Sequence, residues 1–235
     1  MQFFVDTHVH TSETSKCGRS TAAEMIAAYK NAGFGAVVIS DHFVNGNSVC
    51  AGKHAPWHTR IDQVLRGYHA ACRAGKRLGV HVLLGWEWGH QCADYVTTGL
   101  PESFLYEHPE IEDMAPPEYC ELVHACGGFV IRAHPFRMAS YMNGVMPAQY
   151  PECVDAIEIV NGGHLLMNRA DFDTQAREQC EAYGKIATAG SDAHLAKNAA
   201  MTGMVFPFEI DSEAALVAAL RAGKGTIIPN PQYGK

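Results

Sequence analysis

Short apolar runs and amphipathic segments alternate along most of the chain. Apolar runs with the length of buried strands lie at 3–5, 36–39, 81–88, 129–132, 156–160 and 185–189. Helical spacing of apolar residues occurs at 21–30, 59–78, 118–125 and 169–183. Additional strands are expected at 94–98, 203–208 and 226–228. Strands that alternate with helices predict an α/β protein built on a parallel sheet.

Local signals mark the ends of several helices. Thr21 and Glu24 have the spacing of a capping box, and Gly33 follows the same helix as a C-terminal glycine does. We expect Asp211 to cap the last helix, which Gly223 ends.

Composition narrows the class of protein. The chain has 235 residues, of which 47% are hydrophobic and 18% charged, so it can bury a sizeable core. No repeat, low-complexity tract or linker interrupts the pattern, and we therefore predict a single domain over residues 1–235. The long loops at 43–57 and 135–152 are expected to shape a pocket.

Charge and cysteine content limit the partners. A net charge of −7 disfavours nucleic acid as the main partner, because neutralising phosphates needs clustered Lys and Arg. The eight cysteines contain no C-x-x-C pair, which favours reduced thiols. No basic segment precedes the first apolar run, and no run reaches the ~18 residues of a membrane span. We expect a cytoplasmic protein without a membrane partner, and the oligomeric state stays open.

Side chains that can bind metal ions follow most of the predicted strands. Along an extended strand alternate side chains share a face, so Asp6, His8 and His10 are expected to point together, while Asp41 points away from His42. The C-terminal ends of parallel barrel strands meet at one edge, where active sites are built. That edge would collect His8, His10, His42, Glu87, His134, Asp192 and His194.

The types of these side chains indicate a metal centre. Imidazole and carboxylate without thiolate suit Zn, Mn or Fe. The ligands are too many for one tetrahedral ion, which implies two or three divalent metal ions. Paired ions can hold a hydroxide that is deprotonated near neutral pH and can bind phosphate oxygens. No nucleophile from the protein is then required.

These motifs resemble those of the PHP (polymerase and histidinol phosphatase) family. The matching segments, in order, are Asp6-x-His8-x-His10, Ser40-Asp41-His42, Glu87, Ala133-His134-Pro135 and Gly190-Ser191-Asp192-Ala193-His194. The resemblance implies a distorted (β/α)7 TIM-like barrel with two or three metals at the C-terminal ends of its strands. It also implies a phosphoesterase, since the family includes histidinol phosphatase, nucleotide phosphatases and exonucleases.

The resemblance assigns ligands by position. The first metal would be held by His8, His10, Glu87 and Asp192, the second by His42 and His194, and the third by Glu87 and His134. The catalytic centre would lie around Glu87, Asp192 and His194.

Two positions depart from the family pattern. In the loop after His10 we favour Glu13 as a ligand, with Cys17 as the alternative or as a structural thiol. Asp94 stands near the position of a missing histidine and is expected to replace it with hard oxygen ligands. If neither substitution works, the site is binuclear.

Polar residues near the same edge are candidates for substrate binding. The guanidinium of Arg137 suits bidentate phosphate binding, and Arg19 and Lys197 are weaker candidates, although each is equally typical of a solvated surface. Asn161 ends a strand there. Three loop histidines, His54, His58 and His90, could line the cleft and include a general acid, although a surface or structural role is more typical of each.

The sequence therefore predicts a metal-dependent phosphoesterase, a hydrolase of a small phosphate monoester or nucleotide that uses a metal-bridging hydroxide. One alternative is an amidohydrolase-like enzyme for C–N bonds, against which the second histidine of Asp192-Ala193-His194 argues. Others are an exonuclease-type phosphodiesterase and a metal-binding module without activity. Buried polar groups would be costly in such a module unless metal were bound.

Overall fold

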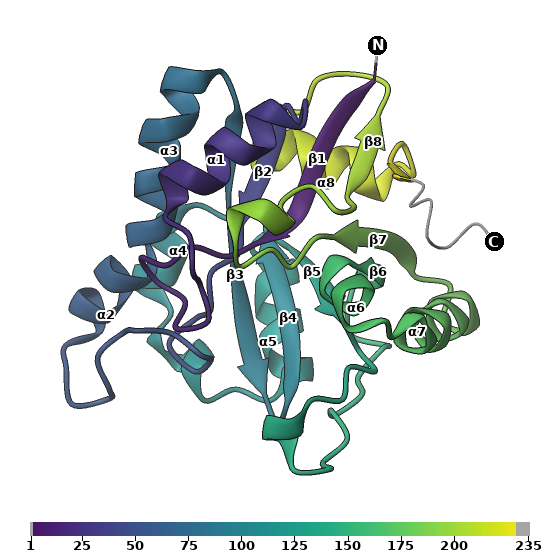
Figure 1. Ribbon diagram of the computed structural model, residues 1–235. Coiled ribbons are helices and arrows are strands. Elements are labelled where there is room, and N and C mark those ends of the chain that lie inside the picture. The colour runs from purple at the N-terminus through teal and green to yellow at the C-terminus, as the bar shows by residue number, and fades with distance from the viewer. Residues whose placement is uncertain (1, 229–235) are drawn as a thin grey trace.

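A single mixed sheet forms the centre of the computed structural model, which describes residues 2–228 (Figure 1). Within that range the sheet has nine strands in the spatial order β7-β6-β5-β4-β3-β2-β1-β8-β9. The strands are β1 (Phe3–Val9), β2 (Ala36–Ile39), β3 (His81–His90), β4 (Ala93–Thr98), β5 (Phe129–Ala133), β6 (Ala156–Asn161), β7 (Ile186–Gly190), β8 (Met204–Phe206) and β9 (Thr226–Ile227).

The sheet curves until its two sides nearly meet. β1, β2 and β3 pair in parallel, as do β5, β6 and β7. At the closing edge Val9 forms a parallel bridge with Ala193, and Thr7 Oγ1 donates to Ala189 O at 3.1 Å. The predicted barrel-like α/β fold is confirmed. Its distortion comes from β4, which is antiparallel to both neighbours, and from β8, which is antiparallel to β1.

The β3–β4 hairpin has no turn signal in the sequence. Its two turn residues, Gln91 and Cys92, both have positive φ, at 47° and 61°. Turns of this kind favour Asn and Gly, neither of which is present. The hairpin sets Asp94 opposite Gly89 on one side and Ala133 on the other. Asp94 therefore pairs with the residue two positions after Glu87 on β3, and with the residue just before His134 on β5.

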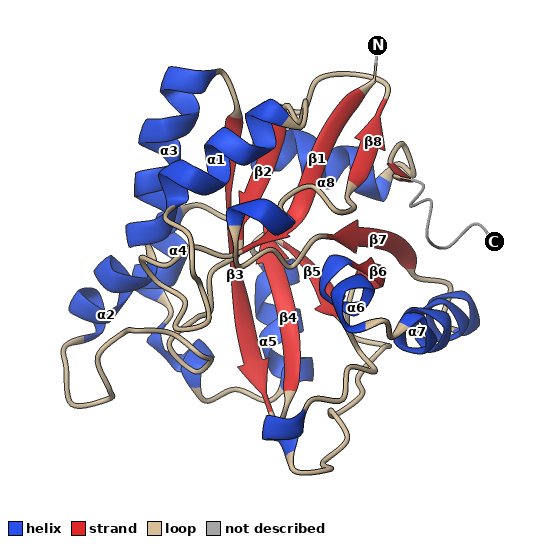
Figure 2. Ribbon diagram, viewed as in Figure 1, coloured by secondary structure: helices blue, strands red, loops and turns tan. Residues whose placement is uncertain are grey.

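Helices cover the outside of the sheet (Figure 2). They are α1 (Ala22–Asn31), α2 (Trp57–Val64), α3 (Arg66–Leu78), α4 (Glu102–Glu107), α5 (Pro116–Ala125), α6 (Gly162–Met167), α7 (Ala170–Ala182) and α8 (Glu213–Arg221), with 3-10 turns η1 (Pro109–Glu112), η2 (Ser140–Met142) and η3 (Ala196–Asn198). Met25, Ile26 and Tyr29 of α1 are fully buried in an apolar layer with residues of β2 and α3. Across 2–228, no helix combines the length and apolar character needed to cross a bilayer.

Several predicted helix ends are confirmed and two need correction. The capping box at Thr21 is present, and Gly33 follows α1 with a φ of 82°. The last helix is capped by Ser212, whose hydroxyl accepts from Ala215 N, and not by Asp211.

The segment predicted as one helix over 59–78 is two helices that meet at Leu65. The Thr14 hydroxyl enters the break, where it donates to Val64 O at 3.1 Å and accepts from Gly67 N at 3.1 Å. A side chain inserted into the backbone hydrogen-bond ladder is an established cause of such a break. The loop after His10 thus also shapes the helix that covers it.

The Tyr119 hydroxyl of α5 generates a stability prediction. It accepts from Trp86 Nε1 at 2.7 Å and lies 2.7 Å from Thr97 Oγ1, all fully buried. Tyr119→Phe would leave the Trp86 N–H without a partner, so we expect the free energy of unfolding to fall by about 1–3 kcal/mol. Urea denaturation measures the change, with the exposed Tyr183→Phe as control. Equal stability of the two variants would contradict the prediction.

Candidate metal centre

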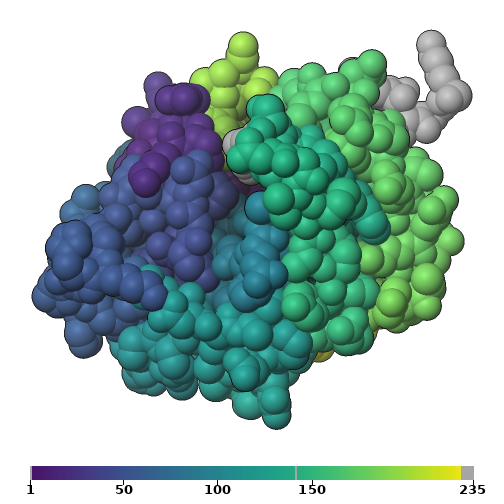
Figure 3. All heavy atoms as spheres, turned by 90° about the horizontal axis from the view of Figure 1, so that it is seen from below, coloured from purple at the N-terminus to yellow at the C-terminus, as the bar shows by residue number. Residues whose placement is uncertain are grey.

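The ends of five parallel strands, together with β4, bring the predicted ligands to one cavity. The cavity has a volume of about 630 Å³. Its lining comprises Cys17, His42, Asn47, Glu87, Cys92, Asp94, His134, Arg137, Asp192 and His194. Seen from below, the surface is hollowed between the indigo segment of the 43–57 loop and the green segment of the 135–152 loop (Figure 3). Both long loops therefore border the cavity.

The potential ligand atoms form four overlapping groups, in each of which they lie within 4.8 Å of one another. The groups are His8–His10–Glu87, His8–His134–Asp192, Glu87–Asp94–His134 and His10–His42–His194. His8 and His10 are fully or almost fully buried, as are Glu87 and Asp192. A centre for more than one metal ion is consistent with this arrangement.

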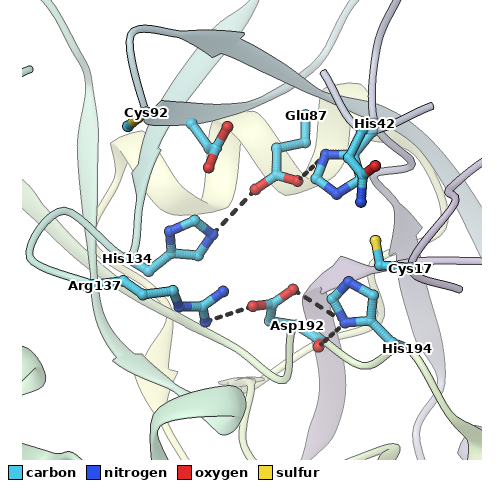
Figure 4. Close-up of a pocket in the computed structure, with 10 residues that line it drawn as sticks. Cys17, His42, Glu87, Cys92, His134, Arg137, Asp192 and His194 are labelled. Carbon is cyan, nitrogen blue, oxygen red and sulfur yellow. Dashed lines mark hydrogen bonds and ion pairs between the residues drawn. The ribbon is translucent and has the colours of Figure 1, made fainter. Parts of the chain in front are cut away.

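Glu87 lies between His134 and His42 and faces both (Figure 4). Its Oε1 lies 3.1 Å from His134 Nε2 and 3.3 Å from His8 Nε2. Its Oε2 lies 2.8 Å from His42 Nδ1. One carboxylate therefore faces imidazoles from three different strand ends, as a bridging ligand does.

Two contacts fit metal ions better than hydrogen bonds. His42 Nδ1 and Glu87 Oε2 are buried and lack a hydrogen-bond partner despite their short separation. The Nε2 atoms of His8 and His10 face each other at 3.1 Å. Buried polar atoms without a partner are costly. A divalent cation between them would satisfy these lone pairs, so the residues present fit the group that the sequence implied.

Comparison with known proteins agrees with this geometry. The family model for PHP-associated sequences matches residues 173–224. A two-domain protein from Bacteroides vulgatus, containing a predicted PHP-like metal-dependent phosphoesterase, is 15% identical with a TM-score of 0.70. The similarity covers 98% of this chain and 65% of that protein. The chain has a PHP-like fold.

Two further solved structures share this PHP-like fold. PsfC from Pseudomonas syringae is 16% identical, with a TM-score of 0.65 over 98% of this chain and 93% of PsfC. An amidohydrolase from Chromobacterium violaceum, solved with bound sulfate, is 14% identical, with a TM-score of 0.53 over 99% of this chain and 100% of that one. No curated protein matches the sequence. At these identities the similarity establishes the fold alone.

An outer layer of polar groups orients the imidazoles of this cluster. His8 Nδ1 lies 3.0 Å from Glu158 Oε1, and His10 Nδ1 lies 3.1 Å from Ser15 Oγ. Ser15 Oγ in turn donates to Asp41 Oδ1 at 2.6 Å. Because the Nδ1 atoms are engaged outward, both Nε2 atoms point into the cluster, as metal-ligating histidines require.

Sequence reasoning did not single out Glu158. Besides His8, its carboxylate accepts from the backbone N of His134 at 3.0 Å and from Asn161 Nδ2 at 2.7 Å. Glu158 places a carboxylate inside the apolar run Ile157-Glu158-Ile159. A charged residue within a buried strand is the sequence feature that could have identified it. Asn161, expected at the rim, proves to be the cap of α6, where its side chain accepts from Gly163 N.

The buried groups of the cluster shift one another's pKa values. Although burial opposes protonation, the neighbouring carboxylates raise the pKa values of His8 and His42 well above the usual value. Burial and the neighbouring His194 lower the pKa of His10 to about 3, so its imidazole is neutral and able to ligate. Burial opposes ionisation of Asp192, but Arg137 and His8 hold the pKa of Asp192 well below its usual value. Burial likewise opposes ionisation of Glu87, yet His42 and His8 keep its pKa low. These carboxylates therefore remain charged.

Backbone conformation at the cavity is unusual. His134 and Asp192 have positive φ, at 28° and 49°. Non-glycine residues in this region carry strain that surrounding structure must stabilise, and such residues cluster at functional sites. Neither conformation could be inferred from the residue types.

Two expectations about site residues are corrected. Asp6 does not share a face with His8, because the strand register shifts after Asp6 and its carboxylate accepts from Tyr29 OH at 2.8 Å. Glu13 lies outside the cluster, since both its oxygens accept from Ala22 N at 3.0 Å at the start of α1. Cys17, the alternative from the same loop, lines the cavity instead.

The three candidates for substrate binding differ in whether they line the cavity. Arg137 lines the cavity, whereas Arg19 and Lys197 are exposed and lie outside its lining. The three loop histidines proposed as acids are also absent from that lining; these are His54, His58 and His90. Asp94 joins Glu87 and His134 in one of the four groups, which is the position expected of it.

Glu158 generates a prediction about metal affinity. Glu158→Gln preserves shape but weakens the acceptor that orients His8, and loss of such a partner typically reduces metal affinity about 10- to 100-fold. Calorimetric titration of Zn²⁺ into metal-free protein measures the effect. The exposed Glu178→Gln is the matched control. Unchanged affinity in Glu158→Gln would show that His8 needs no such support.

Proposed function

We propose that this protein is a metal-dependent phosphoesterase that hydrolyses a small phosphate monoester or nucleotide. The observation that carries the proposal is the position of Arg137. Its Nη2 lies 2.5 Å from Asp192 Oδ2, so a guanidinium faces the same cavity as the buried ligand cluster. A cation with fork geometry beside a metal centre suits phosphate oxygens.

The metal positions are those that the PHP resemblance assigns, and the groups already described support them. One ion would be held by His8, His10, Glu87 and Asp192, another by His42 and His194, and a third by Glu87 and His134 together with Asp94. Bound divalent ions lower the pKa of water and neutralise charge on phosphate oxygens. Zn, Mn and Fe all match this ligand set.

Hydrogen bonds to neighbouring side chains hold the Arg137 guanidinium in place. Arg137 Nε donates to His164 Nε2 at 3.2 Å, and His164 Nδ1 lies 2.6 Å from Asp173 Oδ1. Burial lowers the pKa of His164, which keeps the ring neutral with Nε2 as an acceptor. Arg137 Nη2 also donates to Asn161 Oδ1 at 2.6 Å. These contacts fix the guanidinium plane, which reduces the entropy lost when phosphate binds.

Cavity size supports a small substrate. About 630 Å³ lies within the range of small-molecule sites. The net charge of −7 disfavours the binding of long nucleic acids. An exonuclease-type activity is therefore the alternative and not the main proposal. A C–N hydrolase would use similar metals and is the second alternative to be tested.

Metal-dependent hydrolysis of model esters tests the proposal. We expect protein treated with chelator to be inactive, and added Mn²⁺ or Zn²⁺ to restore hydrolysis of p-nitrophenyl phosphate above that of bis-p-nitrophenyl phosphate. Elemental analysis should find two or three metal ions per chain. Preference for the diester would favour the exonuclease-type alternative. Full metal content with hydrolysis of amides alone would favour the C–N hydrolase, and failure to bind metal would refute the proposal.

Arg137 generates a second kinetic prediction. Removing one positioned charge donor typically costs about 10²-fold or more in rate, and we expect Arg137→Ala to lower kcat/KM for a phosphate monoester by about 10²-fold. Arg137→Lys should recover part of the loss, because lysine lacks the planar fork. The exposed Arg177→Ala is the control. Equal activity of the Arg137 and Arg177 variants would remove Arg137 from the site.

A further inference from the structure

A thiol faces the histidine side of the metal centre. His10, His42 and His194 form one of the four ligand groups, and the His10 and His194 rings stack with centroids 4.3 Å apart. Cys17 lines the same cavity, as do His42 and His194. Figure 4 shows its sulfur beside these two rings, on the side opposite Arg137.

The loop that carries Cys17 is fastened on both sides. Before it, Lys16 N donates to Asn47 O at 2.9 Å, which ties the loop to the segment after His42. After it, Arg19 N donates to His194 O at 2.7 Å. Close backbone packing also requires Gly18, where an added Cβ would lie 2.3 Å from Thr11 O. The backbone therefore fixes the position of the thiol between the two imidazoles.

A second observation indicates a cation on this side. Glu87 is 1% exposed, and its Oε2 has no hydrogen-bond partner although it faces His42 Nδ1, another orphan, at 2.8 Å. A cation bound between the Glu87 carboxylate and a deprotonated His42 ring would satisfy both buried atoms. Glu13, the other candidate ligand of the loop, is engaged at α1, and Lys16 is exposed.

We propose that Cys17 supplies a thiolate ligand to the metal ion held by His42 and His194. The thiol proton passes to solvent when the metal–sulfur bond forms. Soft thiolate favours Zn²⁺ over Mn²⁺, whereas the positions around Glu87, Asp94 and Asp192 offer imidazole and hard oxygen. The centre would therefore be chemically divided, with one sulfur-containing position and others without sulfur. This inference rests on the proposed metal centre and names a ligand within it.

Cobalt substitution provides the test. A Co²⁺–thiolate bond gives an intense near-ultraviolet charge-transfer band, which imidazole and carboxylate ligands do not. We expect metal-free protein titrated with Co²⁺ to develop this band and Cys17→Ser to lack it. Cys92→Ser is a matched control, because Cys92 lines the same cavity but stands apart from His42 and His194 (Figure 4). The control should retain the band.

The outcomes distinguish the proposed role of Cys17 from the existence of the metal centre. Stoichiometric Co²⁺ binding without the band, or a band lost in Cys92→Ser and kept in Cys17→Ser, would overturn the role of Cys17 and leave the centre intact. Failure of wild type to bind any metal would refute the proposed function itself. If Cys17→Ser does not fold, X-ray absorption of Zn²⁺-loaded wild type decides: a sulfur neighbour at about 2.3 Å supports the inference, and a shell of nitrogen and oxygen alone refutes it.

Discussion

Burial of charge is the constraint on which this structure depends. Glu87, Glu158 and Asp192 carry carboxylates at a few per cent exposure or less, in a region where an unpaired charge is very costly. Each therefore faces imidazoles, a guanidinium or a backbone N–H. The strand ends of the barrel are the places that can supply such partners from many parts of the chain at once. Stability and the capacity to bind cations thus arise from one arrangement.

Two departures from a regular barrel complete the centre. The antiparallel β4 brings Asp94 beside Glu87 and His134, and the approach of β7 to β1 brings Asp192 beside His8 and His10. A regular series of βα units would not place a hairpin strand at this edge. The distortion is therefore part of how the ligand set is assembled.

The cavity has two chemically different sides around Glu87. On one side lies the guanidinium of Arg137, held by His164 and suited to phosphate oxygens. On the other side the thiol of Cys17 lies near His42 and His194 and offers a softer donor (Figure 4).

Apolar runs and the polar residues that end them were enough to predict a parallel α/β sheet with His8, Glu87 and Asp192 at one edge, because strand and helix periods are local properties of the sequence. The distorted barrel was predicted from the resemblance to the PHP family. Tertiary structure alone decided the rest. A turn at Gln91 without glycine made the β4 hairpin, and the start of α1 drew Glu13 away from the cluster. The role of Glu158 likewise needed contacts across 150 residues. Such outcomes depend on competition between distant partners, which no local pattern records.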